Sequence, residues 1–263
     1  MDVMKELAEY YGSYDEDGRL RSRHGMVEFL TTMRYIERYL QPGMRILEIG
    51  AGTGRYSHAL AQRGYAVDAV ELVQHNIDVF REKTRPGEKV TVRQGNATDL
   101  NMLESETYDI TLLLGPMYHL FSVEDQRKAL SEAIRVTKRG GIVFAAYCGN
   151  EATMIQYCFQ RGMLREKRYR ELVDPVTFKA SSDPAELFQL YRKEDIDALM
   201  AGFPVTRLHY VGTDMATNYM RKEVDAMDDE FFELYLRYHY VICERSDLVG
   251  ASHHLLDVFR RYR

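Results

Sequence analysis

The chain has 263 residues, of which 45% are hydrophobic and 29% charged, a balance typical of a folded soluble enzyme and far from a disordered composition. Its net charge of −5 argues against a nucleic-acid-binding surface, because such surfaces carry an excess of Lys and Arg. The three scattered cysteines, Cys148, Cys158 and Cys243, exclude a disulfide scaffold and a zinc site, and indicate buried thiols in a reducing compartment.

Residues 1–6 lack the basic start and apolar run of a signal peptide. Elsewhere, no apolar run approaches the roughly 18 residues that a membrane span needs. We therefore expect a cytoplasmic protein without a membrane partner.

Between residues 43 and 148, short apolar runs alternate with segments of helical periodicity, which predicts a parallel sheet wound by helices. Strands are expected at 44–49, 65–71, 89–93, 108–114 and 141–148. Helices are expected at 53–63, 74–83 and 123–138, the last ended by Gly140 and Gly141. The fourth strand is the most apolar, so we place it at the centre of the sheet.

Three further segments flank this core, which we bound at residues 31–150. Residues 1–30 form a polar, Tyr-rich leader, and residues 151–200 resemble a mostly helical insertion. Residues 201–263 are expected to add two strands, 205–211 and 254–260, separated by a helix over 228–242. The predicted fold is a single α/β domain with a doubly wound, mostly parallel, seven-stranded sheet.

Residues 47–56 read Leu-Glu-Ile-Gly-Ala-Gly-Thr-Gly-Arg-Tyr and join the first predicted strand to the first predicted helix. This is where a parallel sheet binds a nucleotide, and glycines let the backbone approach the ligand closely. The spacing is Gly-x-Gly-x-Gly, and Arg55 stands where a dinucleotide fingerprint needs its third glycine. A phosphate-binding loop is also excluded, because no Gly-Lys-Ser/Thr follows.

The pattern Glu-x-Gly-x-Gly-x-Gly closely resembles the first motif of the class I S-adenosylmethionine-dependent methyltransferases, and the resemblance spans roughly residues 40–150. It implies S-adenosylmethionine as cofactor and S-adenosylhomocysteine as product. It also implies that the turn and the following helix contact the cofactor, through Glu48, Gly50, Ala51, Gly52, Gly54 and Tyr56. Tyr56 would cover the methionine end of the cofactor, or equally be a core tyrosine.

Two later positions match the family's cofactor contacts. Glu71 ends the second strand 21 residues after Gly50, where the family's carboxylate grips the ribose, and Leu72 follows it. After the third strand the family often has Asp-Ala at the adenine amine, and this chain has Asn96-Ala97. An amide can still accept from that amine, although Asn-Ala is also an ordinary turn.

Residues 114–120 read Leu-Gly-Pro-Met-Tyr-His-Leu and leave the carboxyl end of the central strand. They lack the Asn/Asp-Pro-Pro-Tyr/Phe motif of nucleobase and protein-amide methyltransferases, and resemble a bacterial branch of small-molecule methyltransferases. Leu114 would contact the cofactor. The ordinary pKa of a histidine side chain suits a general base, so His119 could remove a proton from the methyl acceptor, and Tyr118 could orient that acceptor. A histidine bonded to the backbone and a tyrosine that only packs are equally good interpretations of the two residues.

The resemblance also implies that residues 1–30 fold over the cofactor as a lid and that residues 151–200 cap the substrate. Lid residues that could contact substrate are Tyr11, Tyr14, Arg21 and His24. The adjacent His253 and His254 do not indicate a metal, because neighbours on a strand point to opposite faces, and we expect no metal site.

The leading hypothesis is therefore in-line transfer of a methyl group to a small-molecule N, O or S nucleophile, by a monomer or homodimer that binds no nucleic acid. The alternatives are an RNA or protein methyltransferase, disfavoured by the acidic balance, and a cofactor-binding protein without catalysis.

Overall fold

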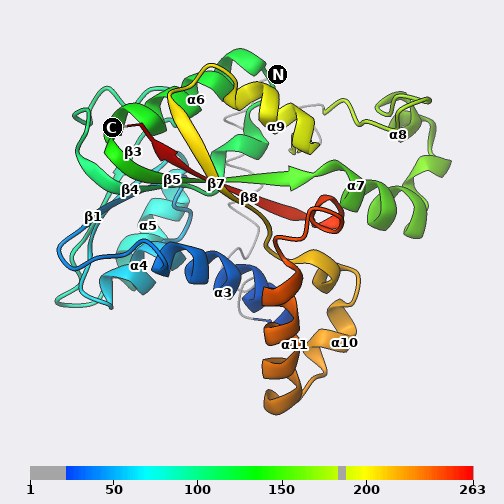
Figure 1. The fold of residues 1–263 in the computed structure, drawn as a ribbon, viewed down its shortest axis with the longest axis horizontal. Helices are drawn as coiled ribbons and strands as arrows, with labels where there is room; N and C mark the ends of the chain where they lie inside the picture. The colour runs from blue at the N-terminus through cyan, green and yellow to red at the C-terminus, as the bar shows by residue number, and fades with distance from the viewer. Residues whose placement is uncertain (1–21, 183–187, 263) are drawn as a thin grey trace.

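The computed structural model describes residues 22–182 and 188–262. One sheet organises them, in the strand order β3-β2-β1-β4-β5-β8-β7, with β6 paired to β5 outside this path (Figure 1). The strands are β1 (Arg45–Ile49), β2 (Ala66–Glu71), β3 (Val90–Gln94), β4 (Tyr108–Leu113), β5 (Thr137–Gly149), β6 (Leu190–Tyr191), β7 (Val205–Gly212) and β8 (His254–Arg261). All pairs are parallel except those that β8 makes with β5 and β7. The predicted doubly wound, mostly parallel sheet is confirmed.

Over the described residues the sheet has eight strands, so the expected number of seven was too low by one. The additional strand, β6, is only two residues long and pairs with Cys148 and Gly149 at the carboxyl end of β5. So short a strand carries no periodicity that a sequence pattern could reveal.

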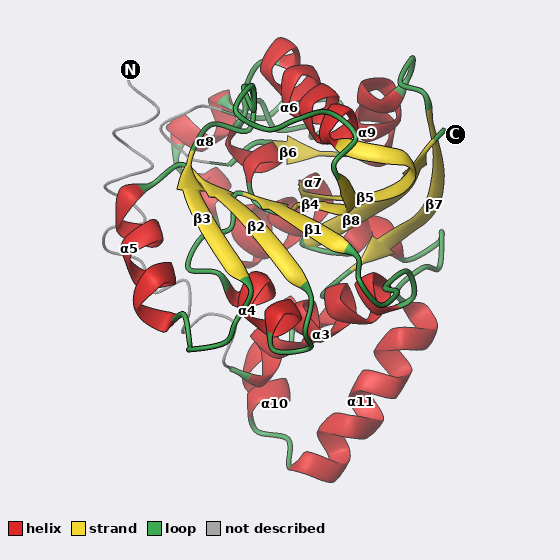
Figure 2. Ribbon diagram, turned by 90° about the vertical axis from the view of Figure 1, so that its left-hand side faces the viewer, coloured by secondary structure: helices red, strands yellow, loops and turns green. Residues whose placement is uncertain are grey.

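Helices cover both faces of the sheet (Figures 1 and 2). One face carries α3 (Arg23–Glu37), α4 (Arg55–Ala61) and α5 (Gln74–Lys83), and the other carries α6 (Val123–Val136) and α9 (Lys193–Met200). Each face has its own apolar core, with Ile36 and Leu60 in one and Leu130 and Leu199 in the other. The helix α3 crosses residue 30, where we had placed the limit between lid and core.

The helix predicted over 123–138 ends at Val136, and Gly140-Gly141 does not terminate it. Thr137 instead opens β5 and lies opposite Tyr108, and its hydroxyl donates to the Ala133 carbonyl at 2.6 Å. Gly140, at φ 79°, lies where the register between β4 and β5 shifts, so the glycines serve a bulge inside the strand.

Apart from η1 (Pro116–His119), the other helical segments that the structure describes lie after residue 149. They are α7 (Asn150–Thr153), the π-helix η2 (Met154–Gln160), the short helix η3 (Met163–Arg165), α8 (Lys167–Glu171), η5 (Met215–Asn218), α10 (Arg221–Asp225), α11 (Asp229–Ile242) and η6 (Val249–Ala251). In Figure 2, α10 and α11 extend below the sheet beside α3. Among residues 22–182 and 188–262, we find no helix long and apolar enough to cross a membrane.

The topology brings six chain segments to one edge of the sheet. The carboxyl ends of the parallel strands β1, β2, β4 and β5 meet there. Because β8 runs antiparallel to β5, its first residue, His254, pairs with Cys148 at that same edge. The end of β7 lies beside it, since Gly212 pairs with Leu255. Ligands of such sheets bind at this edge.

Candidate active site at the carboxyl edge of the sheet

The glycine-rich turn has backbone angles that only glycine adopts easily. Gly50, Gly52 and Gly54 all have positive φ, at 72°, 54° and 86°. A Cβ added at Gly50 would lie 2.5 Å from Cδ of Pro116, so the turn after β1 packs directly against the turn after β4. A Cβ at Gly52 would meet nothing within 4 Å, because this residue lines a cavity.

That first cavity, of about 490 Å³, contains the cofactor-contact residues predicted from the sequence, apart from Gly54. They are Glu48, Gly50, Ala51, Gly52, Tyr56, Glu71, Leu72, Asn96, Ala97 and Leu114. Gly54 lies behind the turn, where an added Cβ would strike the Phe80 ring at 2.3 Å. The structure thus gathers four separate segments of the chain around one space, and contact with the cofactor itself stays a prediction for each residue.

Glu71 is buried and holds the glycine turn in place. Its Oε2 accepts from the Gly52 amide at 2.8 Å, and its Oε1 accepts from the Val73 amide at 2.9 Å and from the Asn76 side chain at 3.2 Å. An ionised carboxylate has about four acceptor positions. Three are occupied here, so Glu71 keeps capacity for a ribose hydroxyl.

Asn96, like Glu71, makes a structural hydrogen bond and keeps further hydrogen-bonding capacity for a ligand. Its Oδ1 accepts from the Thr98 amide at 3.0 Å, which closes the turn after β3. The predicted acceptance from adenine would therefore use the oxygen's second lone pair, and the amide NH2 would donate to a ring nitrogen.

Glu48 is a buried acid at the base of the first cavity, with 2% of its surface exposed. Burial raises its pKa to about 8, although hydrogen bonds from the Ser57 hydroxyl and amide oppose the shift, and the nearby charge of Glu71 adds to it. A carboxyl group under these conditions favours a cationic ligand, whose charge would allow it to ionise. The cavity therefore suits a cofactor that carries a sulfonium and an ammonium group.

We expect Glu48→Gln to become increasingly more stable than the wild type as the pH rises from about 5 to 8. The folded protein retains a proton on Glu48 that the unfolded chain releases near its ordinary pKa, so wild-type stability falls across this window. At pH 8 the difference should exceed about 1 kcal/mol, since one pKa unit corresponds to about 1.4 kcal/mol. Urea unfolding of the cofactor-free protein at several pH values measures it, and a pH-independent difference would contradict the raised pKa.

The predicted catalytic residues lie on the short helix η1 (Pro116–His119) after β4. The Tyr118 hydroxyl donates to the Leu114 carbonyl at 2.8 Å, and its ring lines the first cavity. His119 also lines that cavity, with its ring 5.1 Å from Tyr118 and 5.2 Å from Phe188. The roles of Tyr118 and His119 in catalysis stay predictions.

A second cavity of about 420 Å³ adjoins the first, and three residues line both: Glu28, Tyr118 and His254. Its walls come from α3, from the 151–200 insertion through Tyr157 and Tyr169, and from the segment after β7. His24, the one predicted lid residue that the structure describes, also lines it, and its Nδ1 lies 2.7 Å from Asp225. Tyr11, Tyr14 and Arg21 lie outside the described residues.

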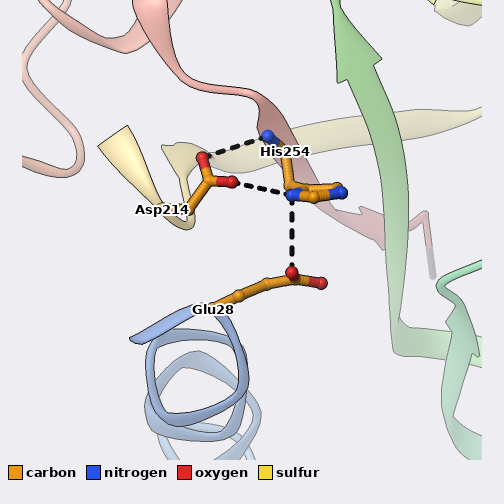
Figure 3. Close-up of side chains that lie close together, drawn as sticks. All are labelled: Glu28, Asp214 and His254. Carbon is orange, nitrogen blue, oxygen red and sulfur yellow. Dashed lines mark hydrogen bonds and ion pairs between the residues drawn. The ribbon is translucent and has the colours of Figure 1, made fainter. Parts of the chain in front are cut away.

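The polar group where the two cavities meet was not predicted from the sequence. Glu28, Asp214 and His254 come together there from α3, the end of β7 and the start of β8 (Figure 3). One signal was available, because an antiparallel last strand must begin at the edge where the parallel strands end. The assumption that His253 and His254 face opposite ways was also unsound, since His253 precedes β8 and both line the second cavity.

Comparison with known proteins agrees with this geometry. Residues 46–141 match a family model described as a methyltransferase domain. The chain is 30% identical over 157 residues to a demethylmenaquinone methyltransferase of Clavibacter sepedonicus, which covers 59% of each protein. It is 24% identical over 200 residues to a ubiquinone biosynthesis O-methyltransferase of Hahella chejuensis, covering 73% of this chain and 81% of that one.

The fold also resembles that of a magnesium protoporphyrin IX methyltransferase of Synechocystis solved with S-adenosylmethionine bound. The TM-score is 0.57 at 12% identity, and the match covers 99% of this chain and 98% of that one. The sheet thus has the Rossmann-like fold of methyltransferases, and the match to the methyltransferase domain covers its first four strands and the start of β5. Among the relatives it resembles are enzymes named for quinone methylation.

Proposed function

We propose that the protein transfers a methyl group from S-adenosylmethionine, held in the first cavity, to a small molecule held in the second. The observation that carries this proposal is the junction of the two cavities at Glu28, Tyr118 and His254. Transfer requires the acceptor atom to approach the methyl group in line with the bond to sulfur, so two adjoining spaces are the arrangement that it needs.

The second cavity favours a small acceptor over a macromolecule. Its volume of about 420 Å³ lies within the range of small-molecule pockets. Aromatic residues of the insertion, Tyr157 and Tyr169, form part of its wall, which supports the cap role predicted for residues 151–200. The Hahella relative is named as an O-methyltransferase of ubiquinone biosynthesis, which supports a hydroxyl oxygen as the acceptor atom.

In this proposal the chain's own residues bind the cofactor and orient the acceptor. Glu71 and the glycine turn would fix the ribose and methionine ends of the cofactor, while Glu48 would balance its positive charge. Tyr118 would position the acceptor at the junction, and His119 stays a candidate base on the side of the first cavity. The lid role of residues 1–30, the monomer or homodimer, the cytoplasmic location and the absence of a nucleic-acid partner remain part of the same proposal.

An acceptor screen tests the function directly. The full chain is incubated with S-adenosylmethionine and a panel of small phenols, quinols, amines and thiols, and release of S-adenosylhomocysteine is measured. We expect turnover with at least one ring that bears a hydroxyl group. Turnover only with RNA or a protein, together with binding that weakens steeply with salt, would reverse the proposal in favour of a macromolecular acceptor.

A further inference from the structure

A histidine, His254, lies where the two cavities meet. His254 is the first residue of β8, and its Nδ1 lies 2.7 Å from Oδ2 of Asp214 and 3.4 Å from Oε2 of Glu28. Figure 3 shows both carboxylates on the Nδ1 side of the ring, with the other ring nitrogen pointing away from them.

Asp214 is held as an anion in a fixed orientation. It is 2% exposed, and its Oδ1 accepts from the Ser252 hydroxyl at 2.6 Å and from the amides of His253 and His254 at 2.9 and 3.1 Å. Its Oδ2 accepts from the Asn218 side chain as well as facing His254. Burial opposes its ionisation, but the charge and hydrogen bond of His254 outweigh burial and hold the pKa of Asp214 well below its usual range.

The anion determines which ring nitrogen of His254 carries the proton. An ionised carboxylate only accepts hydrogen bonds, so Nδ1 must donate to Asp214. In the neutral imidazole, Nε2 is then the acceptor, which is the arrangement in which a buried aspartate orients a catalytic histidine in other enzymes.

The other charged groups around His254 are compatible with proton uptake there. Glu28 on α3 would stabilise the imidazolium as a second carboxylate. Burial and the charge of His254 lower the pKa of the adjacent His253 to about 4, so His253 stays neutral. Arg221 on α10 donates to Asn218 at 2.6 Å, on the far side of that side chain from Asp214.

We propose that His254, oriented by Asp214, is the general base that removes the proton from a hydroxyl acceptor in the second cavity. This inference rests on the proposed function. In the step, Nε2 takes the hydroxyl proton as the acceptor oxygen bonds to the methyl carbon. The bond from methyl to sulfur breaks with its electron pair going to sulfur, and the imidazolium later releases its proton to solvent. A hydroxyl group needs this help because it holds its proton near neutral pH.

A cation site formed by the same three residues fits less well. Their ligand atoms lie within 4.8 Å of one another. However, the oxygens of Asp214 already accept from Ser252, Asn218, the two histidine amides and the His254 ring, and a metal would have to displace that ring donor. We therefore assign base chemistry to the cluster.

The test compares His254→Asn with His119→Asn in the full chain, using a hydroxyl acceptor identified in the screen. His254→Asn should lower single-turnover transfer by about 100-fold or more. It should also abolish the decline of rate at acidic pH, and leave affinity for S-adenosylhomocysteine nearly unchanged by calorimetry. His119→Asn should retain that acidic decline. An unchanged profile in His254→Asn, or its loss in His119→Asn, would overturn the proposal.

Two further measurements test the base role of His254 independently of the proposed function. Nitrogen-15 NMR of the histidine rings, without acceptor, should show His254 protonated at Nδ1, and the opposite tautomer would overturn the base role whatever the acceptor. Titration with Mn²⁺ or Zn²⁺ should show no stoichiometric site that Glu28→Gln removes, and such a site would replace the base by a metal centre. If no acceptor in the screen is methylated, the proposed function fails, but the NMR result still decides the orientation of His254.

Discussion

Replacing Gly50 by Ala is expected to weaken binding of S-adenosylhomocysteine by about 100-fold or more and to destabilise the protein by about 2–5 kcal/mol. A left-handed backbone costs an L-residue roughly 1–2 kcal/mol, and overpacking adds about 1–3 kcal/mol. Both apply here, because Gly50 has φ 72° and the new Cβ would lie 2.5 Å from Cδ and 2.7 Å from Cγ of Pro116. The rigid proline ring cannot turn aside, so the turn itself must shift.

Gly43→Ala is the matched control. Gly43 has a similar φ of 82°, but nothing lies within 4 Å of the position of its Cβ, and it lies outside both cavities. We expect it to lose only about 1–2 kcal/mol of stability, from backbone strain alone, and to bind cofactor as the wild type does. Urea unfolding and calorimetry measure both quantities. Wild-type affinity in Gly50→Ala would show that the turn tolerates movement and is not the cofactor site.

Arg207→Ala should destabilise the fold by about 3–5 kcal/mol, because it leaves a buried carboxylate without its partner. Arg207 on β7 donates from Nε and Nη2 to the two oxygens of Asp257 on β8, at 2.6 and 2.9 Å. The Asp257 side chain is fully buried, and burial raises its pKa despite the adjacent guanidinium. The loss should shrink as the pH falls, since a protonated Asp257 needs no countercharge.

The exposed pair Arg245–Asp247 provides the contrast. Both side chains are more than half exposed and screened by solvent, so Arg245→Ala should leave the free energy of unfolding nearly unchanged. Replacing both members of the buried pair, as Arg207→Met with Asp257→Leu, should recover most of the loss. Equal effects of Arg207→Ala and Arg245→Ala would mean that water reaches Asp257 between the strands.

The two strands also connect stability to the proposed chemistry. Asp214 follows the end of β7 and His254 begins β8, so the geometry of the pair depends on the β7–β8 register. That register contains an irregularity between Arg207 and His209, the point at which Arg207 reaches Asp257. We infer that the buried ion pair helps to set the position of the histidine proposed as base.

Features carried by short stretches of chain were predictable from the sequence. The strands β1, β2 and β4 lie within one residue of their expected bounds, because buried parallel strands are short segments rich in apolar residues. The glycine turn was predictable for the same local reason, since only glycine tolerates three nearby positive φ angles. Glu71 followed from its fixed distance along the chain, and the structure places it at the Gly52 amide.

Contacts between distant segments were decided only by the tertiary structure. The end of α6 moved to Val136 because Thr137 found a strand partner in Tyr108, and β6 exists because Leu190 reached Cys148. Glu28, Asp214 and His254 are ordinary polar residues in their own segments, with no local pattern that marks them. Their meeting depends on β8 running antiparallel to β5, which brings the end of the chain back to the carboxyl edge of the sheet. Local physics thus determined where the cofactor motif lies, whereas strand pairing across the whole chain determined what lies opposite it.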